Sequence, residues 1–150
     1  MNLSARLKKN QGFTLIEFVL VMAIIAVISA IATPYLLGSK EKILLQTEQE
    51  KILSDLKNAQ QQSIAAYRGY EYSVIFNPPH QYRLQPENEA KTIHPDVEIL
   101  SISPVSTISF EKLSGKPSSP LTLTLASTRF SCDIAVNDQG LISATTLEVR

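Results

Sequence analysis

The residues with the clearest chemical potential lie close together near the start of the chain: Gly12, Phe13 and Glu17. Glu17 is the one charged residue in an apolar run, GFTLIEFVLVMAIIAVISAIATPYLL, that extends over residues 12–37. A carboxylate in an apolar segment is costly and usually has a partner. If the chain is cut between Gly12 and Phe13, the new amine of Phe13 lies four residues from Glu17. The two groups can then pair, either within one helix or between staggered neighbouring helices.

The remaining residues that can bind a metal ion do not form a recognisable site. His80 lies in a Pro-Pro turn and His94 precedes a proline, and neither has cysteine or carboxylate neighbours at ligand spacing. Three oxygen-bearing residues, Asp133, Asn137 and Asp138, can offer ligands to calcium, but the residue order of a calcium-binding loop is absent. We therefore expect a turn near Asp138, and we expect no metal and no cofactor.

Cys132 is the one residue with the chemistry of a strong nucleophile. It alternates with Phe130 and Ile134 in a period of two, so we expect it to face the core of a sheet as a small apolar side chain. A nucleophile needs a base and an orienting group, and no motif supplies them. No phosphate-binding loop, nucleophile elbow or pair of catalytic carboxylates occurs either. The sequence therefore predicts that the protein is not an enzyme.

The apolar run is long enough to cross a membrane. From Phe18 to Leu37 no charge occurs over about twenty residues, the length that a helix needs to span a bilayer core. Three basic residues precede the run: Arg6, Lys8 and Lys9. Because no acidic residue precedes Glu17, this imbalance predicts a cytoplasmic N-terminus, with the rest of the chain across the membrane. We interpret residues 1–12 as a targeting leader and residues 13–37 as a transmembrane helix.

The expected cleavage point distinguishes this segment from an ordinary signal peptide. In a signal peptide, a small-x-small cleavage site follows the apolar core, and the core is discarded. Here the cleavage point precedes the apolar run, so the mature chain keeps its helix. The sequence KNQGFTLIE over residues 9–17, followed by about twenty apolar residues and Pro34, resembles the class III signal of type IV pilins and type II secretion pseudopilins.

This resemblance implies that a prepilin peptidase cuts after Gly12 and N-methylates Phe13. It also implies that Glu17 neutralises the Phe13 amine of a neighbouring subunit during filament assembly. The implied partners are other pilin or pseudopilin subunits, bound through the N-terminal helix, together with the prepilin peptidase and an inner-membrane assembly platform. The alternative is a plain membrane anchor, in which Glu17 faces water near the cytoplasmic headgroups.

Length and composition limit what the rest of the chain can be. With 150 residues, the chain can form one globular domain on a stalk. It has 14 basic and 14 acidic residues, and loss of the three basic residues of the leader leaves a net charge of about −3. Nucleic-acid-binding proteins usually have a basic surplus, so nucleic acid is not an expected partner. The single cysteine excludes an intramolecular disulfide, although we expect the domain to face an oxidising compartment.

The helical pattern continues beyond Pro34, because a transmembrane helix can accommodate a proline by bending there. Over residues 38–68 an apolar stripe repeats at helical spacing: Leu45, Ile52, Leu56, Ala59 and Ser63, thickened by Ile43, Leu44, Leu53, Ile64 and Tyr67. The opposite face carries charges and is expected to be solvated: Glu41, Lys42, Glu48, Glu50, Lys51, Asp55 and Lys57. We expect Arg68-Gly69 to end the helix, with glycine in the left-handed conformation.

From residue 69 onwards the apolar period changes to two, which is typical of strands. The expected strands cover residues 70–76, 81–85, 97–100, 107–110, 121–125, 130–136 and 141–143, with a polar loop over 86–91. An amphipathic helix followed by antiparallel strands predicts an α+β fold, with the helix packed on one side of an antiparallel β-sheet. The expected organisation is a leader (1–12), a transmembrane or filament-core helix (13–37), the amphipathic half of the helix (38–68) and a periplasmic β domain (69–150).

The globular half resembles a narrower family, the GspH/FimT-type minor pseudopilins and minor pilins. The similar stretches are LKNAQQQSIAAYRGY, YSVIF, ISF before a glycine-bearing loop, and IAVNDQGLIS. This resemblance implies a minor pseudopilin of a type II secretion system, which waits in the inner membrane and then enters a short periplasmic pseudopilus for protein secretion.

Two other functions remain open. A minor type IV pilin for pilus assembly or DNA uptake is the main alternative, and DNA uptake would need a basic patch in the C-terminal part. Residues 137–150 contain only Arg150 against Asp138 and Glu148, which argues against such a patch. A bitopic membrane enzyme is the more distant alternative.

Overall fold

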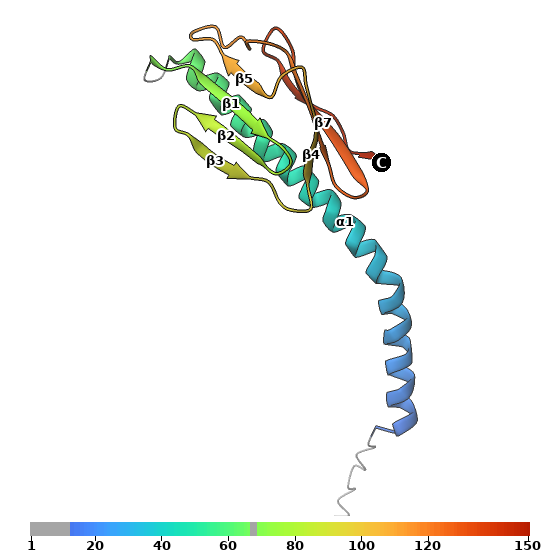
Figure 1. Ribbon diagram of the computed structural model, residues 1–150. Helices are drawn as coiled ribbons and strands as arrows, with labels where there is room; N and C mark the ends of the chain where they lie inside the picture. The colour runs from blue at the N-terminus through green and yellow to red at the C-terminus, as the bar shows by residue number, and fades with distance from the viewer. Residues whose placement is uncertain (1–12, 67–68) are drawn as a thin grey trace, which may run out of the picture. The chain divides into compact units, whose positions relative to one another are not determined.

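The computed structural model describes residues 13–66 and 69–150, without the side chains of residues 31–37. The chain divides into two units, Met1–Leu37 and Gly38–Arg150. One helix, α1 (Leu15–Ile64), passes through both units, and the strands all belong to the second (Figure 1). The strands are β1 (Tyr72–Asn77), β2 (Gln81–Gln85), β3 (Glu89–Thr92), β4 (Glu98–Ser103), β5 (Thr107–Phe110), β6 (Leu121–Ala126), β7 (Phe130–Val136), β8 (Ile142–Ala144) and β9 (Glu148–Val149).

The helix ends earlier than the sequence predicted. Its last residue is Ile64, and the following Ala66 and Gly69 have φ angles of 47° and 73°. Residues with positive φ are typical of helix C-termini, because they turn the chain out of the helical path. Gly69 therefore has the predicted conformation, while Arg68 lies outside the described residues. The predicted bend at Pro34 also remains a prediction, because the side chain of Pro34 is not among those described.

The strands form two antiparallel sheets. The first has the order β3-β2-β1-β5, and the second has the order β4-β6-β7-β8, with β9 also pairing with β7. The predicted α+β class and antiparallel pairing are confirmed, with the strands divided between two sheets. The loop predicted over residues 86–91 is wrong in part, because β3 begins at Glu89. Asn88, with a φ of 55°, closes the turn, since asparagine tolerates the left-handed conformation.

One hydrophobic core joins the helix to both sheets. Leu45, Ile52 and Leu56 of α1 are fully buried in the same cluster as residues of β1 and β6. The predicted stripe along the helix is therefore confirmed at its centre. It is wrong at its edges, because Ile43 is 61% exposed and Ile64 is 46% exposed. Ile43 is left largely uncovered, whereas Ile64 lies close to Gly115 in the loop between β5 and β6.

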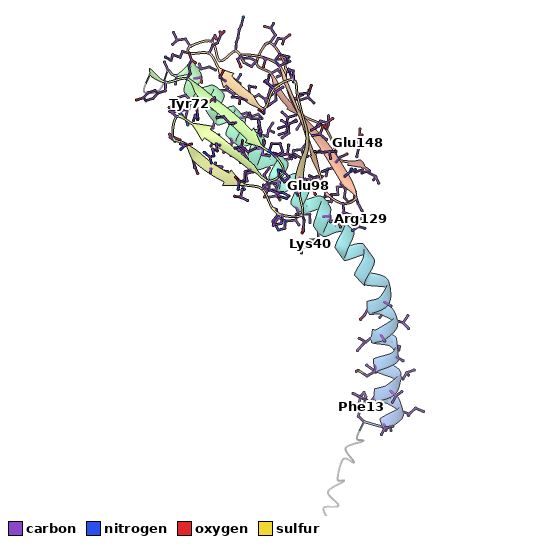
Figure 2. All side chains as sticks on the ribbon, viewed as in Figure 1. Phe13, Lys40, Tyr72, Glu98, Arg129 and Glu148 are labelled. Carbon is purple, nitrogen blue, oxygen red and sulfur yellow. The ribbon has the colours of Figure 1, made fainter. Side chains whose placement is uncertain are left out.

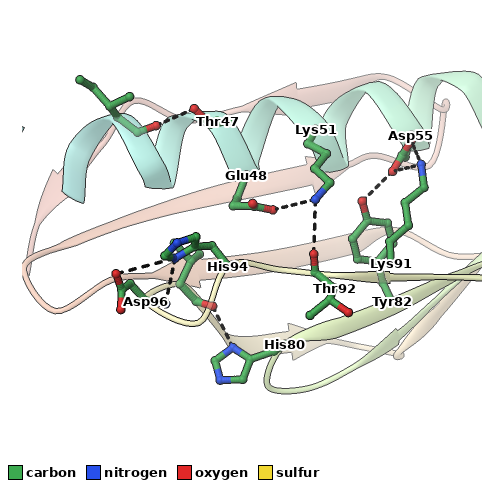
Figure 3. Close-up of polar contacts among 12 residues, drawn as sticks. Thr47, Glu48, Lys51, Asp55, His80, Tyr82, Lys91, Thr92, His94 and Asp96 are labelled. Atoms are coloured by element: carbon green, nitrogen blue, oxygen red, sulfur yellow. Dashed lines mark hydrogen bonds and ion pairs between the residues drawn. The ribbon is translucent and has the colours of Figure 1, made fainter. Parts of the chain in front are cut away.

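A polar contact at the flank of the core corrects a second prediction. Asp55 was expected on the solvated face, but it accepts a hydrogen bond from the Tyr82 hydroxyl at 2.6 Å and pairs with Lys91 at 2.8 Å (Figure 3). Glu48, also expected in solvent, is only 9% exposed and pairs with Lys51 at 3.5 Å. Strands β2 and β3 fold over this edge of α1 and cover both carboxylates. The hairpin of β2 and β3 is thus held to the helix by charge as well as by apolar packing.

The last turns of α1 are fixed to two loops by one amide. The Nε2 of Gln60 donates to the carbonyl oxygens of Gly115 at 3.0 Å and Gly140 at 2.8 Å. Both glycines have positive φ, and a Cβ at either would lie 2.5–2.7 Å from side-chain atoms of Ile64 or Gln60. Both positions favour glycine, because their φ angles lie in the left-handed region and the loops approach the helix closely.

Candidate functional site

Two of the predicted site residues, Phe13 and Glu17, lie at the start of α1, where the first turn is capped by Thr14. The Thr14 hydroxyl accepts a hydrogen bond from the Glu17 N–H at 3.3 Å, and the Thr14 carbonyl accepts one from the Phe18 N–H at 3.2 Å. Thr14 is therefore the N-cap residue, whose side chain supplies an acceptor for a free helical N–H. Thr14 was not among the residues predicted to be functional. The pattern Thr-x-x-Glu over residues 14–17 was the available signal, because it is that of a capping box.

The N-cap at Thr14 determines the position of the Glu17 carboxylate relative to Phe13 at the start of the helix. Glu17 is the acidic residue of the first turn of α1, where the partial positive charge of the helix N-terminus favours an anion. The residue is exposed, and Phe13 immediately before the cap is 71% exposed. Phe13 and Glu17 thus lie about one helical turn apart. Gly12 lies outside the described residues, so its place relative to Phe13 is known from the sequence alone.

Large apolar side chains cover the first part of α1 on all sides (Figure 2). Those exposed in this segment are Phe13, Leu15, Ile16, Phe18, Val19, Leu20, Val21, Met22, Ile24, Ile25, Val27 and Ile28. Exposed apolar surface of this extent is unfavourable in water and marks a surface that lipid or other protein covers. A helix that is apolar on all sides is buried in the working protein, either in a protein core or in a membrane.

Within residues 13–66 and 69–150, no helix meets the length and hydropathy expected of a membrane-crossing segment. The transmembrane prediction for residues 13–37 is therefore not confirmed.

Cys132 takes the position that the alternation predicted. Its side chain is 3% exposed on β7, opposite Leu125 of β6. Burial raises the pKa of the Cys132 thiol to about 12, and the neighbouring Asp133 carboxylate adds to the shift. A thiol with a raised pKa in an apolar environment is a poor nucleophile. The expectation of an apolar core residue at this position is confirmed.

The two histidines take part in local contacts. His80 Nδ1 lies 3.0 Å from the carbonyl oxygen of Val97, while His94 Nδ1 accepts the N–H of Asp96 at 3.2 Å (Figure 3). In the turn predicted near Asp138, the Oδ1 of Asn137 accepts hydrogen bonds from the N–H groups of Gln139 and Leu141. Within the described part of the chain, no three His, Cys, Asp or Glu residues are grouped so that they could hold a metal ion.

Comparison with known proteins gives matches to parts of the chain. Residues 7–33 match the family model described as "Prokaryotic N-terminal methylation motif". Type II secretion system core protein G from Klebsiella pneumoniae is 36% identical over 50 residues, which is 33% of this chain and 33% of that protein. The chain thus matches one third of the length of this curated relative. No solved structure matches the chain significantly.

Proposed function

We propose that this chain, which carries the N-terminal signal of type II secretion pseudopilins and type IV pilins, is a minor pseudopilin of a type II secretion system. In this account a prepilin peptidase cuts after Gly12 and methylates the amine of Phe13. The subunit is held in the inner membrane by residues 13–37, with its N-terminus cytoplasmic and its C-terminal domain periplasmic. An assembly platform then extracts it into a short periplasmic pseudopilus that serves protein secretion.

One observation carries this proposal: α1 has an apolar surface that follows directly after its capped first turn, which contains the acidic residue Glu17. Its large side chains from Phe13 to Ile28 are exposed on all sides of the helix. A lipid bilayer covers such a surface before assembly, and the helices of neighbouring subunits cover it afterwards. The match of residues 7–33 to the methylation motif supports this role for the same segment.

Assembly changes the environment of the Glu17 carboxylate. In lipid, an isolated carboxylate is costly, so the group gains from any fixed cation nearby. Cleavage after Gly12 creates such a cation at Phe13, immediately before the N-cap Thr14. Within one chain, helix capping already places the positive end of α1 beside Glu17. In a bundle, the Phe13 amine of a neighbouring subunit supplies a full charge, and this difference favours the assembled state.

Processing tests the first step of the proposal. Replacement of Gly12 by valine should block cleavage, because the peptidase must accept a residue without a bulky side chain at the cut. Mass analysis of the wild-type N-terminus should find a methylated Phe13. An intact Met1 in cells that contain an active prepilin peptidase would contradict the proposal.

A minor type IV pilin that takes up DNA is the second candidate, and we propose that this chain is not of that kind. Residues 137–150 contain one basic residue, Arg150, and two acidic residues, Asp138 and Glu148, so this segment has no basic surplus. DNA-binding proteins lose affinity steeply as salt rises, because phosphate contacts release counterions. Electrophoretic mobility shifts with duplex DNA at physiological ionic strength should therefore show no binding. Micromolar binding that weakens steeply with added salt would favour the DNA-uptake class. We further propose that the chain has no catalytic activity of its own.

A further inference from the structure

The Oε1 atom of Gln62, near the C-terminal end of α1, is buried and has no hydrogen-bond partner among the described residues. The other end of the same amide is satisfied, because Gln62 Nε2 donates to Asn58 Oδ1 at 3.0 Å, one turn earlier in the helix. A buried acceptor without a partner is rare in folded proteins, because nothing replaces the hydrogen bond that it made to water. The Gln62 oxygen therefore needs a partner.

A small enclosed cavity is lined by Gln62 together with residues of β1 and β2. Its volume is about 20 Å³. A cavity needs roughly 10–15 Å³ of this kind of volume to hold one water molecule. The space next to Gln62 is therefore large enough for a single water and too small for an organic ligand.

Polar side chains on several elements line the same cavity. They are Asp55 and Asn58 of α1, Gln85 of β2 and Glu87 of the β2–β3 turn. Gln85 Oε1 accepts only a long hydrogen bond from the Ser73 hydroxyl, at 3.5 Å, so it can accept another. Asn58 accepts through Oδ1, which leaves its Nδ2 as a donor. The lining thus offers both acceptors and a donor, as a buried water requires.

The charges around the cavity favour water over a metal cation. Both carboxylate oxygens of Asp55 pair with Lys91 Nζ, at 2.8 and 3.0 Å, and one of them also accepts the Tyr82 hydroxyl at 2.6 Å (Figure 3). The Lys91 ammonium neutralises this carboxylate and would repel a second cation beside it. Glu87 is then the remaining carboxylate of the lining. One carboxylate with a few amides is a weak ligand set for calcium, which takes about six to eight oxygen ligands.

We propose that this cavity binds one water molecule, which donates a hydrogen bond to Gln62 Oε1. Its second hydrogen is donated across the cavity, to the amide oxygen of Gln85 or the carboxylate of Glu87. The water thereby links the last turns of α1 to the end of β2. It extends the polar edge of the core from the Asp55–Lys91 pair towards the C-terminal end of the helix.

Magnetic relaxation dispersion of the water oxygen-17 nucleus tests the proposal, because it detects waters that stay in a protein long enough to tumble with it. The full-length chain in detergent is compared with Gln62→Met and Gln62→Glu. Methionine has a similar length and no acceptor oxygen. Glutamate keeps an oxygen at this position but, like methionine, lacks the amide donor to Asn58, so it is the matched control. Both residues are good helix formers, and Gln62 is partly exposed, so we expect both variants to fold.

We expect the wild-type chain and Gln62→Glu to give the same dispersion, and Gln62→Met to lose the contribution of one water. An unchanged dispersion in a Gln62→Met chain that has the circular dichroism of the wild type would overturn the inference. Loss of the same contribution from Gln62→Glu would also overturn it, because the bond to Asn58 and not the buried acceptor would then be decisive.

Urea unfolding gives a second readout. If a water bridges the cavity, Gln62→Met removes the bridge and leaves the facing oxygens unpaired, so its urea midpoint should fall below that of the wild type. If Oε1 has no partner at all, methionine removes a buried unsatisfied atom, and a midpoint equal to or above the wild-type value would overturn the inference. Calcium or a chelator should leave the wild-type midpoint unchanged. A midpoint that rises with calcium would overturn the assignment of water in favour of a cation.

Discussion

The Lys91 ammonium lies 2.8 Å from the Asp55 carboxylate and so ties β3 to α1 across the edge of the core. The same carboxylate accepts the Tyr82 hydroxyl at 2.6 Å, which makes Asp55 the shared partner of two groups on the β2–β3 hairpin. The side chains of Asp55 and Lys91 are only 13% and 24% exposed. Removal of the carboxylate therefore leaves an ammonium and a hydroxyl without this partner in a place where water reaches poorly.

We expect Asp55→Ala to lower the free energy of unfolding by about 2–4 kcal/mol, because uncompensated buried polar groups are costly. Urea unfolding of the detergent-solubilised chain, followed by tyrosine fluorescence, measures the change. Arg129→Ala is the matched control, because the side chains of Arg129 and its partner Glu41 are 46% and 26% exposed. An exposed pair contributes about 1 kcal/mol or less. Equal losses for the two variants would contradict this view of Asp55.

Alkaline pH should weaken the same edge of the fold. Burial raises the pKa of Tyr82 far above its usual value, and the Asp55 carboxylate raises it further. The pKa of Tyr82 is higher in the folded chain than in the unfolded chain. The protonated Tyr82 hydroxyl therefore contributes its full stabilisation below a pH of about 10, and this contribution is lost as the pH rises above that value. Urea midpoints at pH 8 and pH 11 should therefore differ more in the wild-type chain than in Tyr82→Phe. An identical pH dependence of the two proteins would be the opposing result.

The thiol of Cys132 should react slowly in the folded protein. Its side chain is 3% exposed, and burial raises its pKa to about 12. At pH 8 the reactive thiolate is scarce, and access to it requires opening of the sheet. A membrane-impermeant maleimide should label the native chain at least tenfold more slowly than the chain in denaturant. Rapid native labelling, or a dimer linked through Cys132, would contradict the assignment of this residue to the core.

Gly140 and Gly69 have similar positive φ angles but differ in how closely other atoms approach them. Alanine substitutions at the two positions therefore distinguish steric crowding from backbone strain. Gly140 has a φ of 83°, and a Cβ there would lie 2.7 Å from Gln60 Nε2 and 3.0 Å from the carbonyl oxygen of Gly115. Gly69 has a φ of 73°, and among the described residues no atom outside its chain neighbours lies within 4 Å of such a Cβ. Alanine at Gly69 should cost about 1 kcal/mol through backbone strain, and alanine at Gly140 about 2–3 kcal/mol through strain and the displaced Gln60. Urea midpoints that rank the variants in the reverse order would contradict this account.

Periodicity made much of the fold predictable from the sequence. The alternation of Leu121, Leu123 and Leu125 with threonines predicted the strand over residues 121–125, which is β6, and all three leucines are buried. Helical spacing likewise identified Leu45, Ile52 and Leu56 as core residues. These predictions hold because every second residue of a strand, and one stripe of a helix, must face the core.

Long-range pairing was not predictable in the same way. Asp55 reads as a surface residue, since nothing local shows that the β2–β3 hairpin brings Lys91 and Tyr82 to it. Strand β3 has only polar residues and alanine, EAKT, so no apolar alternation marks it. At the candidate site, Phe13 and Glu17 followed from the resemblance at the N-terminus, whereas the cap at Thr14 required the geometry of the first turn.

Filament entry of the Glu17→Gln chain tests the central claim most directly. The substitution removes the charge alone, because the bond to Thr14 comes from the backbone N–H of Glu17 and glutamine is also accepted in a capping box. If Glu17 pairs with the Phe13 amine of a neighbour, loss of one partner in a poorly solvated place costs on the order of 3–5 kcal/mol. That is about a hundredfold or more in an association equilibrium.

The measurement is the amount of tagged chain that copurifies with sheared filaments, relative to the amount that remains in the membrane. We expect Glu17→Gln to be cleaved after Gly12 and to reside in the membrane like the wild-type chain, but to be almost absent from filaments. Thr14→Val, which removes the cap hydroxyl and keeps the charge, is the control for a damaged first turn. Normal recovery of Glu17→Gln in filament fractions would contradict the account and leave a plain membrane anchor.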